Sequence, residues 1–366
     1  MRALVLGRGK SGEAAAALLA SRGCQVDFAE GYGVVVASPG VPVESELQLG
    51  CEELRRRGWR LIAVTGSKGK SSVVKVVAEA ARGVPCGNYG RPVSDLVSDP
   101  PGLAVVEVSS FQLETTALPA DTFEAAAVLN LQEDHLDRHG SVGVYHALKR
   151  RLLGFARVAI AGPSDVAGFE DDAKLFAGSY FDNEALRGNG VIAVELMRIA
   201  GVSEPAIVAA FRGFTPLPHR MSRVADIGGV AYFDDSKATN IAALAAGVRM
   251  VRPPGRDSPA RFVRLIAGGL PKGDDPKSAL PALTERVKKV YLIGQCAKMF
   301  FAAWAGDVEC EICGTLAAAV ESVKRDAVKG DAVLLSPGAA SFDQFNNFGE
   351  RGDVFADLVQ NKEGKK

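Results

Sequence analysis

Residues 60–82 read RLIAVTGSKGKSSVVKVVAEAAR, and this stretch decides the fold class. Its first residues are apolar and partly β-branched, which is typical of a buried strand. A glycine turn follows, and the residues after the turn have the composition and apolar pattern of a helix. Strand, glycine turn and helix in this order predict an α/β domain that binds phosphate where the helix begins.

The glycine turn matches a shortened form of the common phosphate-loop pattern, because Val64 stands where that pattern has its first glycine. The physical chemistry of the loop is retained, since glycines let backbone N–H groups surround phosphate oxygens and the helix dipole favours negative charge. Lys70 can reach the outer phosphates, and the hydroxyl of Ser71 or Ser72 can contact Mg²⁺. The alternative is an ordinary strand-to-helix turn with exposed lysines.

The composition is that of a globular protein of two or three domains. The chain has 366 residues, of which 47% are hydrophobic, and 43 basic residues balance 43 acidic ones. A net charge of zero argues against nucleic acid as a partner. The N-terminus has no secretory pattern and no apolar run approaches about 20 residues, so we expect a cytoplasmic protein without a membrane partner. Cys310 and Cys313 form a lone C-x-x-C without further ligands nearby, which predicts reduced thiols.

The N-terminal segment is a second candidate ligand site. Gly7, Gly9 and Gly12 follow a short apolar strand and precede an alanine-rich helix that ends near Gly23. This spacing fits a dinucleotide fingerprint, with Glu30 as a candidate ribose acceptor. It fits equally any pyrophosphate ligand on a helix N-terminus, or a tight turn without a ligand.

The remaining chain alternates strands and helices. The apolar runs 103–110, 125–131 and 156–162 predict strands of a sheet covered on both faces, and 33–40 predicts a strand near the N-terminus. The last third repeats the strand–helix rhythm, which favours a mainly parallel sheet. Prolines in TPLPH, residues 215–219, suggest a boundary. We therefore predict three consecutive α/β domains: 1–58, small and Rossmann-like; 59–215, like a P-loop ATPase; and 216–366, Rossmann-like.

Four further segments make the interpretation specific. They are VEVSSFQLE (106–114), NLQEDHLDRHGS (130–141), PLPHRM (216–221) with DDSKATN (234–240), and SPGAASFDQFNNFGERG (336–352). Together with TGSKGKS they closely resemble the Mur ligases. Within that family, SSFQLE and SFDQF followed by NF and RG resemble the members that add D-glutamate.

The resemblance implies an ATP-dependent amide-forming ligase of peptidoglycan precursor synthesis. ATP would phosphorylate the carboxylate of UDP-N-acetylmuramoyl-L-alanine, and the amine of D-glutamate would attack the acyl phosphate. A carboxylate accepts an amine only once its oxygen has become a good leaving group, which is why a phosphate loop belongs in such an enzyme. Catalysis would be mainly positioning and charge neutralisation, with Mg²⁺ as cofactor.

The resemblance also assigns roles residue by residue. The catalytic residues would be Lys70, Glu107, His135 and Lys149. Mg²⁺ would be held by Ser71, Glu107, His135 and Lys149, the last as a carbamate. ATP would be bound by Gly66, Ser67, Lys68, Gly69, Lys70, Ser71, Ser72, Asn88, Asn189, His219, Arg220, Asp235 and Lys237. The sugar-peptide and D-glutamate would be bound by Lys10, Ser11, Ser38, Pro39, Gly40, Ser109, His135, Thr239, Lys272, Ser341, Phe342 and Phe348.

The chain departs from the family pattern in several places. The first domain is shortened between Glu30 and Val34, and the central domain between Lys149 and Asn189. The motif around Asn189 lacks its usual histidine, and Asp234 stands in place of a common asparagine. We expect an active monomer with altered nucleotide affinity.

Three rival functions remain open at this stage. An NAD-dependent oxidoreductase would use the first glycine turn but would leave the phosphate loop unexplained. A non-catalytic nucleotide-binding protein would not need Lys70, Glu107 and His135. A related ligase could add another amino acid or extend a folate tail.

Overall fold

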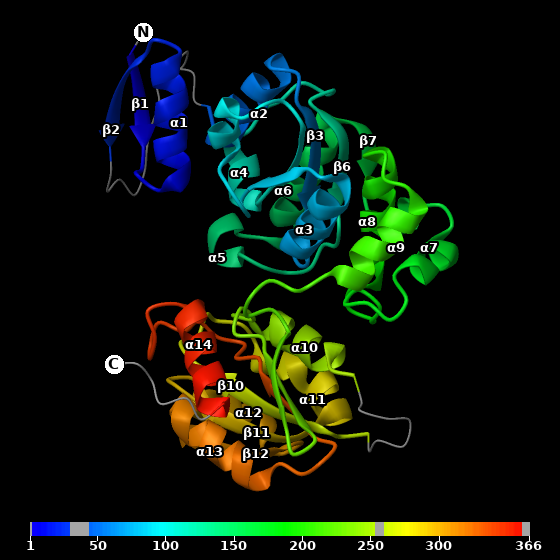
Figure 1. The fold of residues 1–366 in the computed structure, drawn as a ribbon. Helices are drawn as coiled ribbons and strands as arrows, with labels where there is room; N and C mark the ends of the chain where they lie inside the picture. The colour runs from blue at the N-terminus through cyan, green and yellow to red at the C-terminus, as the bar shows by residue number, and fades with distance from the viewer. Residues whose placement is uncertain (1, 30–43, 253–259, 361–366) are drawn as a thin grey trace. The chain divides into compact units, whose positions relative to one another are not determined.

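The computed structural model describes residues 2–29, 44–252 and 260–360. The chain forms two compact units, the first made of residues 1–182 and 186–214 and the second of residues 183–185 and 215–366. Three sheets occur among the described residues, with two and five strands in the first unit and six in the second. The α/β fold class predicted from the sequence is confirmed (Figure 1).

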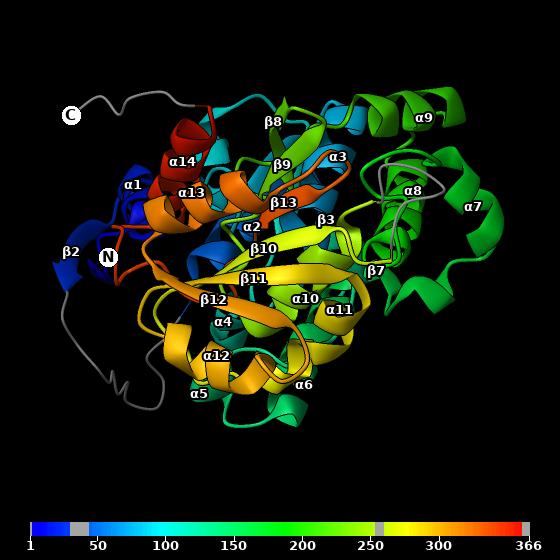
Figure 2. The same cartoon turned by 90° about the horizontal axis from the view of Figure 1, so that it is seen from below.

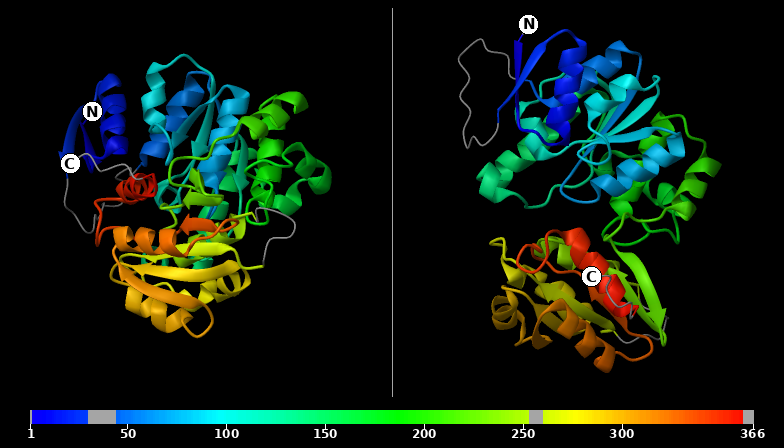
Figure 3. Two further views of the ribbon diagram at one scale, coloured as in Figure 1. Left: turned by 60° about the horizontal axis from the view of Figure 1, so that its bottom comes forward. Right: turned by 60° about the vertical axis from the view of Figure 1, so that its left-hand side comes forward.

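The N-terminal sheet has two parallel strands, β1 (Arg2–Leu6) and β2 (Gln25–Ala29). Helix α1 (Lys10–Ser21) connects them and covers one face of the sheet (Figure 3). A side chain on Gly12 would collide with the carbonyl oxygen of Gly7, so the predicted glycine turn is sterically required. Glu30, the predicted strand 33–40 and the predicted substrate residues Ser38, Pro39 and Gly40 lie outside the described residues.

The second sheet is entirely parallel, with the order β4-β5-β3-β6-β7. Its strands are β3 (Arg60–Thr65), β4 (Val84–Gly87), β5 (Leu103–Glu107), β6 (Phe123–Val128) and β7 (Ala156–Ile160). The α-helices of this region are α2 (Glu46–Arg56), α3 (Lys70–Ala81), α4 (Ser110–Thr115), α5 (Leu136–His139), α6 (Val142–Arg151), α7 (Phe169–Leu175), α8 (Arg187–Ile199) and α9 (Glu204–Gly213). Short 3₁₀ turns are η1 (Val93–Ser98), η2 (Leu152–Phe155) and η3 (Pro163–Asp165).

The central strands of this sheet are buried on both faces, as predicted. Leu61 and Ala63 of β3 share a core with Leu54 of α2, and Ile62 and Val64 are buried on the opposite face. Helices α3 and α8 pack against β5 and β6. The prediction is wrong for β7, whose residues 157–159 are exposed, because this strand forms the edge of the sheet.

The sheet of the second unit has the order β12-β11-β10-β13-β9-β8 (Figure 2). Its strands are β8 (Ser222–Ile227), β9 (Val230–Asp234), β10 (Val263–Gly268), β11 (Val287–Ile293), β12 (Glu309–Gly314) and β13 (Ala332–Leu335). The helices are α10 (Ile241–Met250), η4 (Pro276–Ala279), α11 (Leu280–Arg286), α12 (Ala297–Trp304), α13 (Leu316–Asp326) and α14 (Phe348–Val359). The predicted mainly parallel sheet is confirmed, with β8 antiparallel to β9 as the exception.

Both faces of this sheet carry a hydrophobic core. Leu265 and Ala267 of β10 pack in a cluster with α10, α11 and α12, while Ile266 packs with α13 and α14. Cys310 and Cys313 pack against these two opposite clusters, and neither forms a disulfide among the described residues, in agreement with the free thiols predicted from the sequence.

Candidate active site

The phosphate loop lies between β3 and α3, at the carboxyl edge of the five-stranded sheet. Gly69 is the N-cap of α3 and has a left-handed backbone with φ of 81°, which glycine adopts without strain. A side chain on Gly69 would collide with the amide nitrogen of Asn189, so the loop requires glycine for two reasons. Ser71 and Ser72 are both buried in the first turn of α3.

Two lysines converge on one carbonyl of this loop. Lys70 Nζ donates hydrogen bonds to the carbonyl oxygens of Gly66 at 2.8 Å and Ser67 at 3.3 Å. Lys149 Nζ, from α6, donates to the same Gly66 oxygen at 2.9 Å. Both predicted catalytic lysines therefore lie at the loop that the sequence predicted to bind phosphate.

Lys149 is an unusual cation because only 2% of it is exposed. Burial, reinforced by the nearby charge of Lys70, lowers the pKa of Lys149 to about 7. The ammonium also lies 4.7 Å above the ring of Tyr145, which partly compensates its lost hydration. Near neutral pH a substantial fraction of this amine is uncharged.

Glu107 ends β5 and is 2% exposed. Its Oε1 accepts a hydrogen bond from Asn88 Nδ2 at 2.8 Å, whereas Oε2 is buried and has no hydrogen-bond partner in the part of the chain that the structure describes. An unpaired buried carboxylate oxygen costs free energy unless a cation balances it. This orphaned oxygen, with the buried hydroxyl of Ser71, has the donor chemistry that Mg²⁺ prefers.

The sequence prediction of four metal ligands is only partly reflected in the geometry. Among the described residues, no group of three or more His, Cys, Asp or Glu side chains lies close enough to hold a metal ion. His135 is largely exposed and has a left-handed backbone with φ of 53°. Its assignment as a Mg²⁺ ligand stays a prediction.

Asn130 follows β6 and holds the phosphate loop, a role that sequence reasoning missed. Its Oδ1 accepts from the backbone N–H of Lys68 at 2.9 Å, and its Nδ2 donates to the Lys68 carbonyl at 2.9 Å. The same Nδ2 donates to Asn189 Oδ1 at 3.1 Å. Asn189, predicted to bind ATP, is thus buried beside the loop, and its contact with ATP stays a prediction. The position of Asn130 directly after a buried strand was the available signal.

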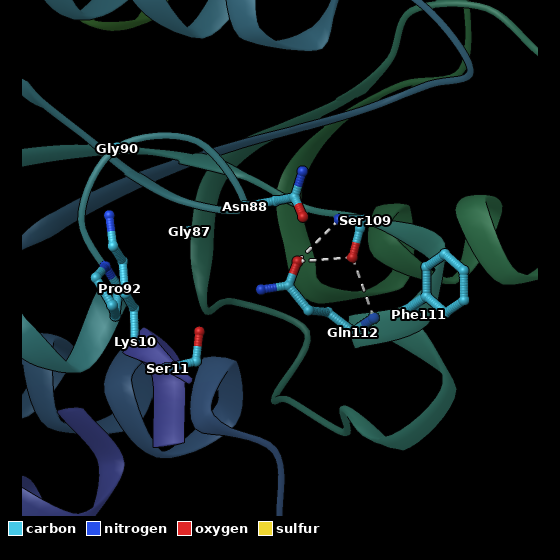
Figure 4. Close-up of a pocket in the computed structure, with 9 residues that line it drawn as sticks. All are labelled: Lys10, Ser11, Gly87, Asn88, Gly90, Pro92, Ser109, Phe111 and Gln112. Carbon is cyan, nitrogen blue, oxygen red and sulfur yellow. Dashed lines mark hydrogen bonds between the residues drawn. The ribbon is translucent and has the colours of Figure 1, made fainter. Parts of the chain in front are cut away.

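A cavity of about 560 Å³ is lined by Asn88, the residue whose side chain donates to Glu107. Lys10 and Ser11 of α1 line one side, and Ser109 and Gln112 line another (Figure 4). Ser109 caps α4 by accepting from the backbone N–H of Gln112, whose own side chain accepts from the backbone N–H of Ser109. The structure thus gathers three predicted substrate residues, Lys10, Ser11 and Ser109, around one cavity. Asn88, predicted to bind ATP, lines the same cavity.

In the second unit, the predicted nucleotide residues Asp235 and Lys237 follow β9, whereas His219 and Arg220 precede β8. Asp235 is buried and accepts a hydrogen bond from Ser336 Oγ at 2.8 Å, and burial raises the pKa of Asp235 to about 7. His219 Nδ1 lies 2.6 Å from Asp234 Oδ2. Lys237 Nζ stands 3.9 Å above the ring of Phe348. Arg220 is adjacent to His219, and its charge lowers the pKa of Asp235 against the effect of burial.

The predicted D-glutamate residues lie at the carboxyl ends of β9, β10 and β13. Lys272 Nζ donates to Thr239 Oγ1 at 3.3 Å. Ser341 is buried, whereas 68% of the neighbouring Phe342 is exposed. These ends of strands are where open α/β sheets bind their ligands.

Arg351 organises this region, and sequence reasoning did not single it out. It is 1% exposed and donates to Ser236 Oγ at 2.9 Å, to the Ser236 carbonyl at 2.8 Å, and to the carbonyls of Ala339 and Ala340. Burial lowers the pKa of Arg351 to about 10. The residue is present in the segment 336–352 that carried the resemblance.

Comparison with known proteins gives a match to the same family in each of the two units. Residues 64–167 match the Mur ligase middle domain, and residues 219–338 match the Mur ligase glutamate ligase domain. A UDP-N-acetylmuramoylalanine–D-glutamate ligase from Rubrobacter xylanophilus is 35% identical over 445 residues, covering 98% of each chain. The chain belongs to the Mur ligase family.

A second UDP-N-acetylmuramoylalanine–D-glutamate ligase, from Acidobacterium capsulatum, is 32% identical over 456 residues, covering 98% of this chain and 96% of the relative. These alignments are longer than the 366 residues of this Mur ligase, so the chain is shortened at internal positions. Where the missing segments lie stays a prediction.

Solved structures agree on the fold. The MurF ligase of Thermotoga maritima in complex with ADP has a TM-score of 0.61 at 16% identity, covering 99% of this chain and 94% of that one. The FolC protein of E. coli in complex with DHPP and ADP has a TM-score of 0.57 at 15% identity, covering 89% and 96%. No helix in the described part of this Mur ligase is long and apolar enough to cross a membrane.

Proposed function

We propose that this chain is an ATP-dependent ligase that joins D-glutamate to UDP-N-acetylmuramoyl-L-alanine in peptidoglycan precursor synthesis. The observation that carries the proposal is the charge arrangement at the phosphate loop: two lysines on the Gly66 carbonyl, beside a sheet whose Glu107 keeps one buried oxygen unpaired. Such an arrangement suits a bound polyphosphate and its cation. The identity of the two substrates is taken from relatives named UDP-N-acetylmuramoylalanine–D-glutamate ligase, which are similar over 98% of the chain.

The reaction proceeds in two transfers. A carboxylate oxygen of the sugar-peptide attacks the γ-phosphorus of ATP, the bond from phosphorus to the bridging oxygen breaks, and ADP leaves. The amine of D-glutamate then attacks the acyl carbon, loses a proton, and expels inorganic phosphate as the amide forms. Lys70 and the loop N–H groups stabilise the negative charge of the phosphoryl group during the first transfer.

The residues present fit Mg²⁺, whose charge would neutralise the phosphate oxygens when it is bound. Glu107 and Ser71 are the ligands best supported, and His135 and a carbamate on Lys149 complete the proposed set. The uncharged amine of Lys149, favoured by its pKa of about 7, is the form that reacts with carbon dioxide. Mass spectrometry of native protein held under carbon dioxide should show a gain of one carbamate on the peptide containing Lys149, and its absence contradicts this assignment.

Residues of the second unit are also proposed to bind substrates. His219, Arg220, Asp235 and Lys237 are proposed to hold ribose and phosphates. Thr239, Lys272, Ser341 and Phe348 are proposed to hold D-glutamate, since a cation and hydroxyls suit a substrate with two carboxylates. Phe342 is a further proposed substrate-binding residue. We further propose a cytoplasmic monomer with domains 1–58, 59–215 and 216–366, which sedimentation and limited proteolysis would test.

The decisive experiment measures ADP and ligated product with the sugar-peptide precursor and four amino acids in parallel. We expect turnover with D-glutamate and less than about a hundredth of it with L-glutamate, L-alanine or L-lysine, because a site built for two carboxylates rejects analogues that leave its groups unpaired. Turnover with another amino acid would indicate a related ligase, and nucleotide binding without turnover a regulatory protein.

A further inference from the structure

A buried three-residue network lies beside the proposed active site. The side chain of His139 is 1% exposed, with Nδ1 at 3.3 Å from Glu114 Oε1 and Nε2 at 3.0 Å from Ser110 Oγ. The contact of Nδ1 with Glu114 is an ion-pair distance, whereas the contact of Nε2 with Ser110 is a hydrogen bond. The imidazole of His139 therefore lies between a carboxylate and a hydroxyl of the same helix.

This network joins two short elements, α4 and α5. Ser110 and Glu114 are four residues apart on α4 and share one face of that helix, and His139 ends the single turn α5. Glu114 also accepts from Arg138 at 2.7 and 3.1 Å. The turn is therefore clamped to the helix by two consecutive side chains.

The clamp reaches groups of the proposed active site on both sides. The backbone N–H of His139 donates to the carbonyl of His135 at 3.0 Å, so fixing His139 also fixes the left-handed residue that begins this turn. Phe111, which lines the cavity, has its ring centroid 5.1 Å from His135 and 5.4 Å from His139. On the other side, Tyr145 lies 5.5 Å from His139 and its hydroxyl donates to Ser67 Oγ in the phosphate loop at 3.2 Å.

We propose that His139 is a positioning residue of the ligase reaction: through Ser110 and Glu114 it locks the turn 135–139 onto α4 and so sets His135 and Phe111 between the cavity and the phosphate loop. The inference rests on the proposed function for its catalytic consequence. Ser110 is only 2% exposed, so the Ser–His–Glu arrangement holds structure and is not a nucleophilic site. None of its three members touches the reacting atoms in this assignment.

The test uses Ser110→Ala and His139→Asn, with His146→Asn as the matched control. His146 lies on α6, and its buried Nε2 has no hydrogen-bond partner among the described residues, so the same substitution there leaves the clamp intact. The chain has only four histidines, which makes ¹³C-histidine NMR directly readable. Spectra are recorded without Mg²⁺ or nucleotide.

We expect Ser110→Ala and His139→Asn to move the His135 ring signal, while His146→Asn removes its own signal and leaves that of His135 in place. In turnover, we expect kcat to fall about 10- to 100-fold for both network variants, with KM for ATP within about twofold, since small misplacement of reacting groups has effects of this size. If His139→Asn does not fold, Ser110→Ala, which removes one hydroxyl, carries the test.

An unmoved His135 signal in folded Ser110→Ala overturns the inference, as does a kcat equal to that of His146→Asn. Should the unsubstituted protein lack ligase turnover, the proposed function fails, and the NMR result still decides whether His139 positions His135.

Discussion

Each unit contains a group of buried charged side chains, and the two groups differ in how completely their polar atoms are hydrogen-bonded. In the second unit, the guanidinium of Arg351 meets the hydroxyl of Ser236 and three backbone carbonyls, so its burial is balanced by hydrogen bonds. In the first unit, Lys70 and Lys149 share the Gly66 carbonyl, and Glu107 leaves one oxygen unpaired. One site is fully hydrogen-bonded within the protein, and the other keeps a buried carboxylate oxygen without a hydrogen-bond partner among the described residues.

This difference distinguishes buried charges that stabilise the fold from buried charges that are suited to binding a ligand. A fully hydrogen-bonded buried cation mainly maintains a local arrangement, and removing it leaves buried carbonyls without donors. Two lysines close together and a carboxylate oxygen without a hydrogen bond both cost free energy in the empty protein. Bound phosphate and a metal ion would offset that cost. Substitution at the first kind of site should change stability, and substitution at the second kind should change turnover.

Unfolding of the two units can be followed separately by tryptophan fluorescence. It contains two tryptophans, Trp59 in the first unit and Trp304 in the second, and both are buried. Replacing one of them by phenylalanine leaves the fluorescence of the other as a reporter of the unit that contains it.

The largest effect is expected for Lys70→Met, which removes a cation from the phosphate loop. We expect kcat/KM for ADP formation to fall by about 10³-fold, or about 4 kcal/mol, because the charge acts where phosphoryl oxygens develop negative charge. Lys75→Met on the same helix is the control, since Lys75 pairs with Glu79. Equal losses for both variants would contradict a special role of the loop.

Arg351→Met should lower the free energy of unfolding of the second unit by about 3 kcal/mol, since four hydrogen-bond acceptors lose their buried donor. Urea unfolding followed by Trp304 fluorescence measures this, and the Trp59 transition should stay in place. Arg223→Met removes an exposed cation paired with Asp226 and should change stability by less than about 0.5 kcal/mol. An equally small change in stability for Arg351→Met would contradict the claim that its buried hydrogen bonds stabilise the second unit.

Glu107→Gln tests the site in the first unit, because glutamine has nearly the same shape as glutamate but no charge. Turnover should fall by about 10²-fold, or about 2.7 kcal/mol, because the anionic ligand for the proposed cation is lost. The unfolding midpoint reported by Trp59 should stay equal or rise, since an unpaired buried charge is removed. A loss of stability as large as that of Arg351→Met would mean that Glu107 serves the fold.

The smallest effect concerns Glu53, a satisfied buried carboxylate in the first unit. Hydrogen bonds from Arg56, then Arg57 and Arg22, hold the pKa of Glu53 well below its ordinary value. A carboxyl group with a lowered pKa contributes stability that is fully present above its unfolded pKa of about 4.3 and is lost as pH falls below it. Glu53→Gln should therefore lower stability by about 1 kcal/mol at pH 7, a modest value because the arginines are partly exposed.

Trp59 unfolding curves at several pH values measure this dependence. The difference between Glu53→Gln and the unsubstituted protein should shrink progressively below about pH 4. A difference that is constant with pH would show that packing, and not the charge of Glu53, stabilises this helix.

Much of the fold was readable along the chain. Local patterns predicted β3, the phosphate loop, α3 and the strand–helix alternation of the second unit. They mistook β7 for a strand covered on both faces, because burial of an edge strand depends on which neighbours the sheet provides. The family and most candidate residues came from the resemblance of short motifs to known ligases.

By itself, then, the sequence determined the order of elements and the chemical groups that follow each strand, since backbone preferences and apolar periodicity act over a few residues. Only the tertiary structure decided which distant groups meet. Lys149 reaches Gly66 across 83 positions and Arg351 reaches Ser236 across 115, and neither partner is implied by local spacing. Burial then shifts the pKa of each cation, because the surrounding protein replaces the water that would otherwise solvate it.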